Sequence, residues 1–269
     1  MKDIKQISDQ IVAWLKNYAE TNKRKALVIG VSGGVDSALV STLCAKTGLP
    51  TICVTMPCHS KEDQTDRGML HINWLQLECL YKNVQSVRID LTATFEVFKT
   101  TINYLSKDFD MPLAYANTKS RLRMIALYQV ATVNEGLVIG TGNKVEDYGV
   151  GFFTKYGDGG VDLSPIGDLT KTEVRAMCRE LGVLPELTNA IPTDGLWEDT
   201  RTDEQQLGAS YEELEWVMWF LDGVGMVGYN PDELSLRQRE VIKSYQKWHN
   251  AGQHKLNPIP VFKLYDNKH

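Results

Sequence analysis

A short glycine-containing turn carries the residues with the clearest chemical meaning in this chain. The segment Ala26–Val31 is apolar and predicts a short buried strand, and the next residues read Ser32-Gly33-Gly34-Val35-Asp36-Ser37. A second apolar stretch, which begins at Ala38, then predicts a helix. Unpaired backbone N–H groups and the positive end of the helix dipole meet in a turn of this kind, so the segment predicts an anion site. A tight turn built from small residues is the alternative interpretation.

The carboxylate of Asp36 needs its own explanation. Gly33 and Gly34 carry no Cβ and let the backbone approach a ligand closely, and Ser32 and Ser37 add hydroxyl donors. A carboxylate in such a cradle would repel a phosphate unless a cation lies between them, and Mg²⁺ is the natural bridge. The turn therefore predicts a phosphate site that is completed by a divalent cation.

The elements around this turn alternate between strands and helices. Strands are predicted at 26–31, 51–56, 84–91 and 136–141, with helical patterns at 1–20, 61–80, 91–105 and 117–133. This alternation predicts an α/β fold: a Rossmann-like, doubly wound parallel sheet flanked by helices. Such sheets bind ligands beyond the carboxyl ends of their strands, so the turns after Val31 and Ile139 are expected to face one crevice.

The second half of the chain is predicted to be mainly helical. Capping boxes start helices at Thr170 and Ser210, and the pair Asn230-Pro231 starts another, whereas the tail from Ala251 is expected to be irregular. We expect a single domain with an N-terminal helix at 1–22, a core at about 25–185, and a mobile loop with C-terminal helices at about 186–269.

Composition excludes several classes of protein. The chain has 269 residues, 43% hydrophobic and 23% charged, with a net charge of −5 and no basic cluster longer than Lys23-Arg24-Lys25, so a nucleic-acid partner is not expected. Its five cysteines form no CxxC pair, which favours a reducing cytoplasm over disulfides or a zinc site. No signal peptide opens the chain, and no apolar run approaches the ~18 residues of a membrane span. The GxxxxGKS or GxxxxGKT loop, the GxSxG elbow and the HExxH helix are all absent.

A glycine-rich stretch from Gly149 to Gly167 contains aromatic residues, a lysine and two aspartates. A loop of this composition indicates ligand binding, with a plain linker as the alternative.

The motifs together resemble one family. The turn Ser32–Ser37 is similar to the pyrophosphate loop of the N-type ATP pyrophosphatases, which include GMP synthetase, asparagine synthetase and NAD⁺ synthetase. Two later segments, Gly140-Thr141-Gly142-Asn143-Lys144 and the run Gly151–Asp162, closely resemble NAD⁺ synthetases. The helix Asn117–Met124 and the pair His254-Lys255 match the same family, so the similarity covers nearly the whole chain.

This resemblance implies an ammonia-dependent ligase that forms a C–N bond. ATP adenylates the nicotinic acid carboxylate of deamido-NAD⁺ and releases pyrophosphate, and ammonia then attacks the acyl-adenylate to give NAD⁺ and AMP. ATP and Mg²⁺ are the implied co-substrate and cofactor, and a homodimer is implied because the dinucleotide of the family lies between subunits. The pyrophosphate loop begins near residue 30, which leaves no room for an N-terminal glutaminase domain, so free ammonia is the expected donor.

The resemblance also implies a set of site residues. Asp36, Lys171 and Asp158 are the expected catalytic residues, with Asp158 holding ammonium or taking its proton, and Asp36 and Glu146 are the expected Mg²⁺ ligands. The expected ATP contacts are Gly30, Val31, Ser32, Gly33, Gly34, Val35, Asp36, Ser37, Thr141, Lys171 and Thr193. The expected deamido-NAD⁺ contacts are Arg121, Lys155, Asp162, His254 and Lys255.

The sequence departs from the family pattern near the second metal carboxylate. The segment between Glu146 and Gly151 is one residue longer than the usual spacing, so Asp147 is an alternative ligand, although Glu146 is preferred. Other interpretations treat Glu146 as a helix-start carboxylate, Arg121 as a surface side chain and Lys171 as a solvated first-turn lysine.

Two rival functions stay open at this point. A tRNA-thiolating enzyme could use the same loop, but it would call for a basic face and paired cysteines. A non-catalytic ATP-sensing module could bind the nucleotide without turnover, but it would have no need for Asp36, Glu146 and Lys171 together.

Overall fold

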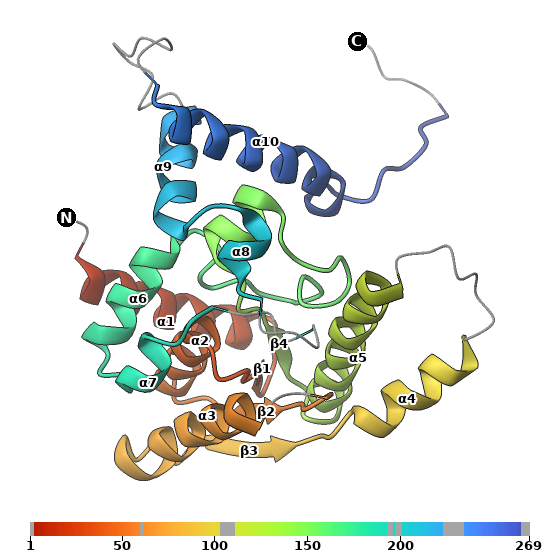
Figure 1. Ribbon diagram of the computed structural model, residues 1–269. Helices are drawn as coiled ribbons and strands as arrows, with labels where there is room; N and C mark the ends of the chain where they lie inside the picture. The colour runs from red at the N-terminus through yellow and green to blue at the C-terminus, as the bar shows by residue number, and fades with distance from the viewer. Residues whose placement is uncertain are drawn as a thin grey trace.

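The computed structural model describes residues 3–59, 62–102, 111–192, 196, 201–222 and 234–264 (Figure 1). Its strands are β1 (Leu27–Gly30), β2 (Thr51–Thr55), β3 (Val84–Arg88) and β4 (Leu137–Ile139). They form one sheet in the order β3-β2-β1-β4, and every strand pair in it is parallel. This arrangement confirms the α/β prediction.

Helices surround the sheet, and their bounds are as follows. The α-helices are α1 (Ile4–Thr21), α2 (Val35–Lys46), α3 (Glu62–Asn73), α4 (Thr92–Thr101), α5 (Met111–Val133), α6 (Lys171–Glu180), α7 (Pro185–Thr188), α8 (Asp203–Leu207), α9 (Tyr211–Leu221) and α10 (Leu236–Leu256). Two segments are π-helical, η1 (Trp74–Glu78) and η2 (Lys144–Val150). None of the helices in the described ranges is long and apolar enough to cross a membrane.

The strands are buried on both faces, and this is why they are apolar without interruption. Successive side chains of a strand point to opposite faces. Leu27 and Ile29 therefore pack with α1, α2 and α6, whereas Val28 packs with α5 on the other face. We call these two packed layers the sheet core. Helices on both faces are what the doubly wound prediction requires.

A second hydrophobic cluster lies apart from the sheet core. It joins η2 to α8, α9 and α10, which lie together on one side of the molecule in Figure 1, far from α3 and β3. We call it the C-terminal cluster, and its buried members are Val145, Val150, Leu207, Ala209, Tyr211, Leu214, Val217, Val241 and Tyr245.

The contact between η2 and α10 is especially close. Gly151 follows η2 in the left-handed region at φ 65°, and a Cβ on it would lie 2.8 Å from the Cα of Gly252 in α10. Two backbones touch here without an intervening side chain. The approach fixes α10 against the segment that carries Glu146.

Three predicted boundaries are wrong. Pro112 lies in the first turn of α5, where proline is tolerated, so it does not precede a helix that starts near 117. Residues 191–209, which are polar and turn-rich and are expected from the sequence to form a loop, contain α8, which the capping box of Thr202 and Gln205 starts. Residues 251–256 are not irregular, since α10 continues to Leu256 and is anchored there by the Gly252 contact. The predicted cap at Asn230 lies outside the described residues, and the single-domain organisation stays a prediction.

Candidate functional site

A cavity opens at the carboxyl edge of the sheet, as predicted. The ends of β1, β2 and β4 line it together with one face of α5, and α3, η2 and α6 add further side chains. The turns after Val31 and Ile139 both border this cavity, so the two small-residue turns do share one crevice.

The turn after β1 has the geometry of an anion site. Helix α2 begins at Val35, and its N-cap Gly34 makes no side-chain capping bond, so the helix N-terminus faces the cavity without a side-chain cap. Ser37 Oγ accepts a hydrogen bond from Ser32 N at 3.2 Å, and Ser32 Oγ accepts one from Gly34 N at 3.2 Å. Gly33 has φ 84°, a conformation that favours glycine. All eight residues from Gly30 to Ser37 line the cavity.

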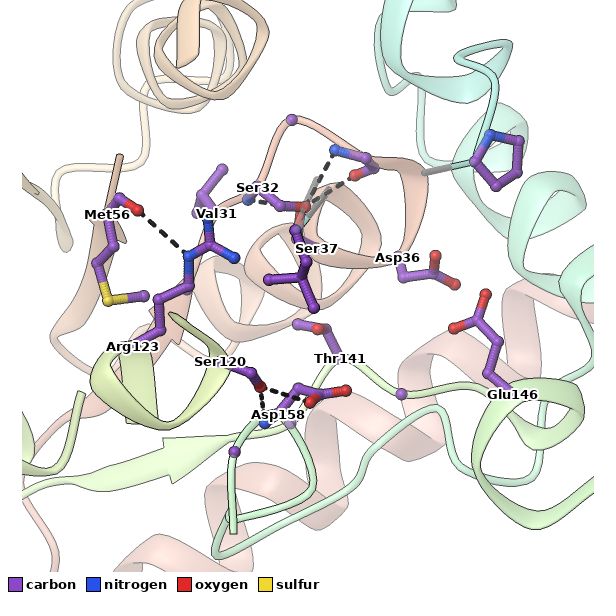
Figure 2. A pocket seen from close by; sticks show the side chains of 18 of the residues that line it. Val31, Ser32, Asp36, Ser37, Met56, Ser120, Arg123, Thr141, Glu146 and Asp158 are labelled. Carbon is purple, nitrogen blue, oxygen red and sulfur yellow. Dashed lines mark hydrogen bonds between the residues drawn. The ribbon is translucent and has the colours of Figure 1, made fainter. Parts of the chain in front are cut away.

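A buried lysine joins this turn to η2. Lys171, the first residue of α6, lies with its Nζ 2.6 Å from Asp36 Oδ2 and 2.8 Å from Glu146 Oε1. Its side chain is 2% exposed, and each carboxylate side chain is 16% exposed. Figure 2 shows the two carboxylates next to each other at one end of the cavity. Lys171 is therefore a buried counter-ion and not a solvated first-turn lysine.

The charges in this cluster support one another. Burial alone would lower the pKa of Lys171, but the two adjacent carboxylates raise it above its ordinary value. Burial likewise opposes ionisation of Glu146, yet Lys171 and the hydroxyl of Tyr211 hold the pKa of Glu146 below its ordinary value. An ammonium that sits between carboxylates marks a place where a cation is stabilised.

Asn143 fixes the relative placement of the two carboxylates. Its side-chain Nδ2 donates to Asp36 Oδ1 at 3.1 Å. Its Oδ1 accepts hydrogen bonds from the backbone N–H groups of Val145 at 3.0 Å and Glu146 at 3.1 Å, and this caps η2. One fully buried amide therefore links the β1 turn to the helix that carries Glu146.

The carboxylates of Glu146 and Asp147, the two candidate metal ligands, lie in different places. The Glu146 carboxylate lies beside Asp36, whereas the Asp147 carboxylate lies against Gly142 on the cavity wall. Burial, together with the charges of Asp158 and Glu146, raises the pKa of Asp147 well above its ordinary value. Both residues lie in η2, whose turn is π-helical and wider than an α-helical one.

Asp158 lines the cavity opposite this cluster. Its Oδ1 accepts hydrogen bonds from Ser120 Oγ at 2.6 Å and from Thr154 N at 2.9 Å, the first of which is drawn in Figure 2. Desolvation by the surrounding protein raises the pKa of Asp158 despite these donors. Thr141 lines the same cavity, and Thr193 lies outside the described residues.

Four of the five expected dinucleotide contacts form a group outside the cavity lining. Arg121 Nε donates to Lys155 O at 3.4 Å, and Lys155 Nζ donates to His254 O at 2.9 Å. Lys255 donates to the carbonyls of Gly151 and Phe153. This group joins α5, the loop after η2 and α10.

Asp162 is not part of that group. Its carboxylate accepts hydrogen bonds from Val138 N at 2.8 Å and Tyr128 Oη at 3.1 Å. These bonds tie the loop to β4 and α5.

Sequence reasoning missed several cavity residues. Arg67, Ser120, Arg123 and Asp203 line the cavity, and Tyr211 supports it from behind. The helical period could have identified the residues on α5, because Ser120, Arg123, Met124 and Leu127 share one face at three- and four-residue spacing. Arg123 donates from Nε to Met56 O at 3.3 Å and is seen at the cavity in Figure 2. No local signal pointed to Asp203 or Tyr211.

A family model described as NAD synthase matches residues 7–259. The chain belongs to the NAD synthase family.

Individual relatives agree with this membership. An NH3-dependent NAD⁺ synthetase of Mesoplasma florum is 39% identical over 218 residues, which cover 79% of this chain and 84% of the relative. One of Alkaliphilus metalliredigens is 34% identical over 262 residues, covering 94% of this chain and 96% of the relative. Among solved structures, an NMN synthetase from Francisella tularensis superposes with a TM-score of 0.83 at 29% identity, over 98% of this chain and 100% of the other.

Proposed function

We propose that this member of the NAD synthase family catalyses the ATP-dependent amidation of deamido-NAD⁺ by ammonia. The carboxylate is first adenylated with loss of pyrophosphate, and ammonia then displaces AMP to form the amide of NAD⁺. The observation that carries the proposal is the Lys171 ion pair with Asp36 and Glu146, set beside the helix N-terminus that follows β1.

The phosphates of ATP are proposed to lie on the β1 turn. Backbone N–H groups at the start of α2 and the hydroxyls of Ser32 and Ser37 are suitable donors for phosphate oxygens. The ammonium group of Lys171 has three N–H donors on a flexible side chain, so it can donate to a phosphate oxygen as well as to the carboxylates. These groups orient the phosphates for in-line attack and stabilise the charge of the leaving pyrophosphate.

The residues present fit a magnesium ion. Asp36 and Glu146 already converge on one cation, Lys171 Nζ, and carboxylate oxygens together with phosphate oxygens and water are the ligands that Mg²⁺ prefers. Among the described residues there is no group of three or more His, Cys, Asp or Glu that could hold a metal alone. When bound, the ion supplies neutralising charge for the pyrophosphate. We assign the protein ligands to Asp36 and Glu146 and not to Asp147.

Asp158 is proposed to handle the ammonium ion. Ammonia is mostly protonated at neutral pH, so a group in the cavity has to accept a proton before nitrogen attacks the acyl-adenylate. The raised pKa of Asp158 brings this carboxylate closer to the working pH than an ordinary aspartate.

The remaining proposals concern binding and assembly. Arg121, Lys155, Asp162, His254 and Lys255 are proposed to contact deamido-NAD⁺. A homodimer and a cytoplasmic location are proposed on the family resemblance, and light scattering coupled to gel filtration tests the dimer.

A second acyl substrate deserves a parallel test. The solved relative named NMN synthetase superposes over nearly the whole chain, so nicotinate mononucleotide is the second candidate substrate. Both candidates carry the same carboxylate and would use the same adenylation chemistry, and they differ only in the adenylate half of the dinucleotide.

The experiment mixes the protein with ATP, Mg²⁺, an ammonium salt and one acyl substrate, and measures AMP and the amide product. We expect NAD⁺ from deamido-NAD⁺, with a higher kcat/KM than for the mononucleotide. The reverse preference would assign the mononucleotide instead. ATP binding without either amide would contradict the synthetase assignment and favour the nucleotide sensor.

Replacing Asp36 tests the carboxylate role in the same assay. Asp36→Ala is expected to lower the rate of pyrophosphate release by about 10²–10³-fold, because the variant loses one of the two carboxylates proposed to hold the Mg²⁺ ion that neutralises the leaving pyrophosphate. Circular dichroism serves as the control for folding. Turnover close to that of the wild type would refute the role assigned to Asp36.

A further inference from the structure

Glu146 receives two hydrogen bonds on the same oxygen. Lys171 Nζ lies 2.8 Å from Oε1, and the hydroxyl of Tyr211 donates to Oε1 at 2.6 Å. The Nζ of Lys171 also lies 4.7 Å from the centroid of the Tyr211 ring. Tyr211 therefore contacts both the carboxylate and the cation that neutralises it.

The fold holds Tyr211 rigidly in this place. Its side chain is 0% exposed and packs in the C-terminal cluster. Tyr211 is the first residue of α9, whose N-cap Ser210 forms a capping box with Glu213. Its own N–H donates to Glu204 Oε1 at 3.1 Å, which ties it to α8. A ring fixed by packing, a cap and a neighbouring helix cannot follow Glu146 if that side chain turns away.

The two donors to Glu146 Oε1 differ in whether they can remain bonded to it when ATP is present. Lys171 is a flexible amine and, in the proposed function, shares its charge with the phosphates of ATP. Tyr211 carries its hydroxyl on a rigid ring, and this hydroxyl donates to Glu146 Oε1 at 2.6 Å, with Asp203 Oδ2 as a second, longer acceptor at 3.4 Å. The tyrosine is thus the donor that continues to orient the carboxylate when ATP is bound.

We propose that Tyr211 is a positioning residue that holds the Glu146 carboxylate in the orientation needed to bind Mg²⁺ together with ATP. The inference rests on the proposed function, in which Glu146 is a ligand of that ion. It gives the C-terminal cluster a part in the chemistry, because the cluster supplies the hydroxyl that orients a carboxylate at the sheet edge.

Tyr211→Phe tests the proposal because it removes only the hydroxyl and keeps the buried ring. Calorimetry measures ATP binding without deamido-NAD⁺, once with excess Mg²⁺ and once with EDTA. We expect the Mg²⁺-dependent affinity for ATP to fall roughly tenfold, the size typical of a lost hydrogen bond to a charged group, and the affinity in EDTA to stay unchanged. The Mg²⁺ concentration for half-maximal pyrophosphate release should rise in parallel, while the KM for deamido-NAD⁺ should not change.

Tyr245→Phe is the matched control. Tyr245 belongs to the same cluster and is 7% exposed, but it stacks on His249 and does not line the cavity. This variant should bind ATP like the wild type under both conditions. In a Glu146→Gln background, Tyr211→Phe should add no further loss of Mg²⁺-dependent binding, because the partner of the hydroxyl is already altered.

Two results would overturn the proposal. One is wild-type Mg²⁺-dependent affinity in Tyr211→Phe. The other is an equal loss of affinity in Mg²⁺ and in EDTA, which would indicate a general disturbance of the site. Urea unfolding shows whether each variant is folded, and if Tyr211→Phe is too unstable at the assay temperature, all titrations are repeated at a lower temperature at which it is folded. The binding readout does not depend on product, so a wild type that makes no NAD⁺ would contradict the proposed function and leave this test decisive.

Discussion

The two sides of the cavity are built in different ways. On the sheet side, the β1 turn offers backbone N–H groups and hydroxyls that are six residues or fewer apart in the chain. On the side of the C-terminal cluster, single side chains reach the site from distant positions, as when Tyr211 contacts Glu146 across 65 residues of sequence. Lys171 lies between the sides and pairs with Asp36 across 135 residues.

The two constructions respond differently to substitutions. A cradle made from backbone depends on the path of one short segment, which the buried strand β1 and the helix α2 fix from both ends. A side-chain contact made from the C-terminal cluster depends on how that cluster packs against the sheet core. Changes at the junction of the two sides are therefore expected to have the largest effects.

Removing the junction lysine should have the largest effect. Lys171→Met leaves Asp36 and Glu146 together without their buried counter-ion, and this should lower the free energy of unfolding by about 3–5 kcal/mol. Urea denaturation measures the change, and added Mg²⁺ should restore part of it. Lys144→Met is the control, because Lys144 pairs with the exposed Asp168, and its loss should cost at most about 1 kcal/mol. Equal losses in the free energy of unfolding for the two substitutions would show that Lys171 contributes no more to stability than an exposed ion pair does.

The sheet core contains a histidine that should make its stability depend on pH. His71 is 0% exposed, and its Nε2 lies 2.8 Å from Ser41 Oγ. Burial lowers the pKa of His71 to about 4 from an ordinary value of 6.5, so in that range the unfolded chain binds a proton that the folded chain does not. Stability is then independent of this group above pH ~6.5 and falls as the pH drops toward ~4, by roughly 3 kcal/mol in all.

Unfolding of the wild type and of His71→Gln, measured over this pH range, isolates the contribution of the histidine. The variant should keep the acid sensitivity of the carboxylates and lose the part due to His71. Parallel pH profiles for the two proteins would rule out a buried neutral histidine.

A smaller effect is expected where the C-terminal cluster meets η2. In a helix, Gly→Ala ordinarily stabilises by up to about 1 kcal/mol. A Cβ on Gly252 would instead lie 2.9 Å from Gly151 Cα, so Gly252→Ala should destabilise by about 2 kcal/mol. Thermal unfolding measures the sign. Ala251→Gly, at an exposed position next to it, is the control and should follow helix propensity alone.

Local patterns predicted the sheet side well. The unbroken apolar strands, the glycine turn and the capping box at Thr170 each lie within a few residues, and the structure contains them all. The ion pair of Lys171 with Asp36 and Glu146 could not be predicted from local patterns. The family resemblance placed the three residues in the expected site but did not predict that they contact one another. Their contact depends on packing between α6, α2 and η2.

The C-terminal side was harder to predict. Six residues at 251–256 carry no clear helical pattern and are nevertheless helical, because Gly252 packs on Gly151 and Lys255 bonds to two carbonyls of the facing loop. Tyr211 could be recognised only as a core residue near a helix start, since nothing local to it indicates a carboxylate that lies 65 residues away in the chain.

The π-helical turn of η2 has a consequence for how such a site can diversify. A wide turn takes in one additional residue locally, so the strand before it and the glycine loop after it keep their register with the rest of the fold. Here the turn carries an acidic side chain on the cavity wall, Asp147, next to Glu146, which pairs with Lys171. A change of one residue in the length of this turn can thus alter the side chain on the cavity wall and leave Asp36 and Glu146 where they are, which makes the segment a natural place to vary substrate preference by length and not by substitution.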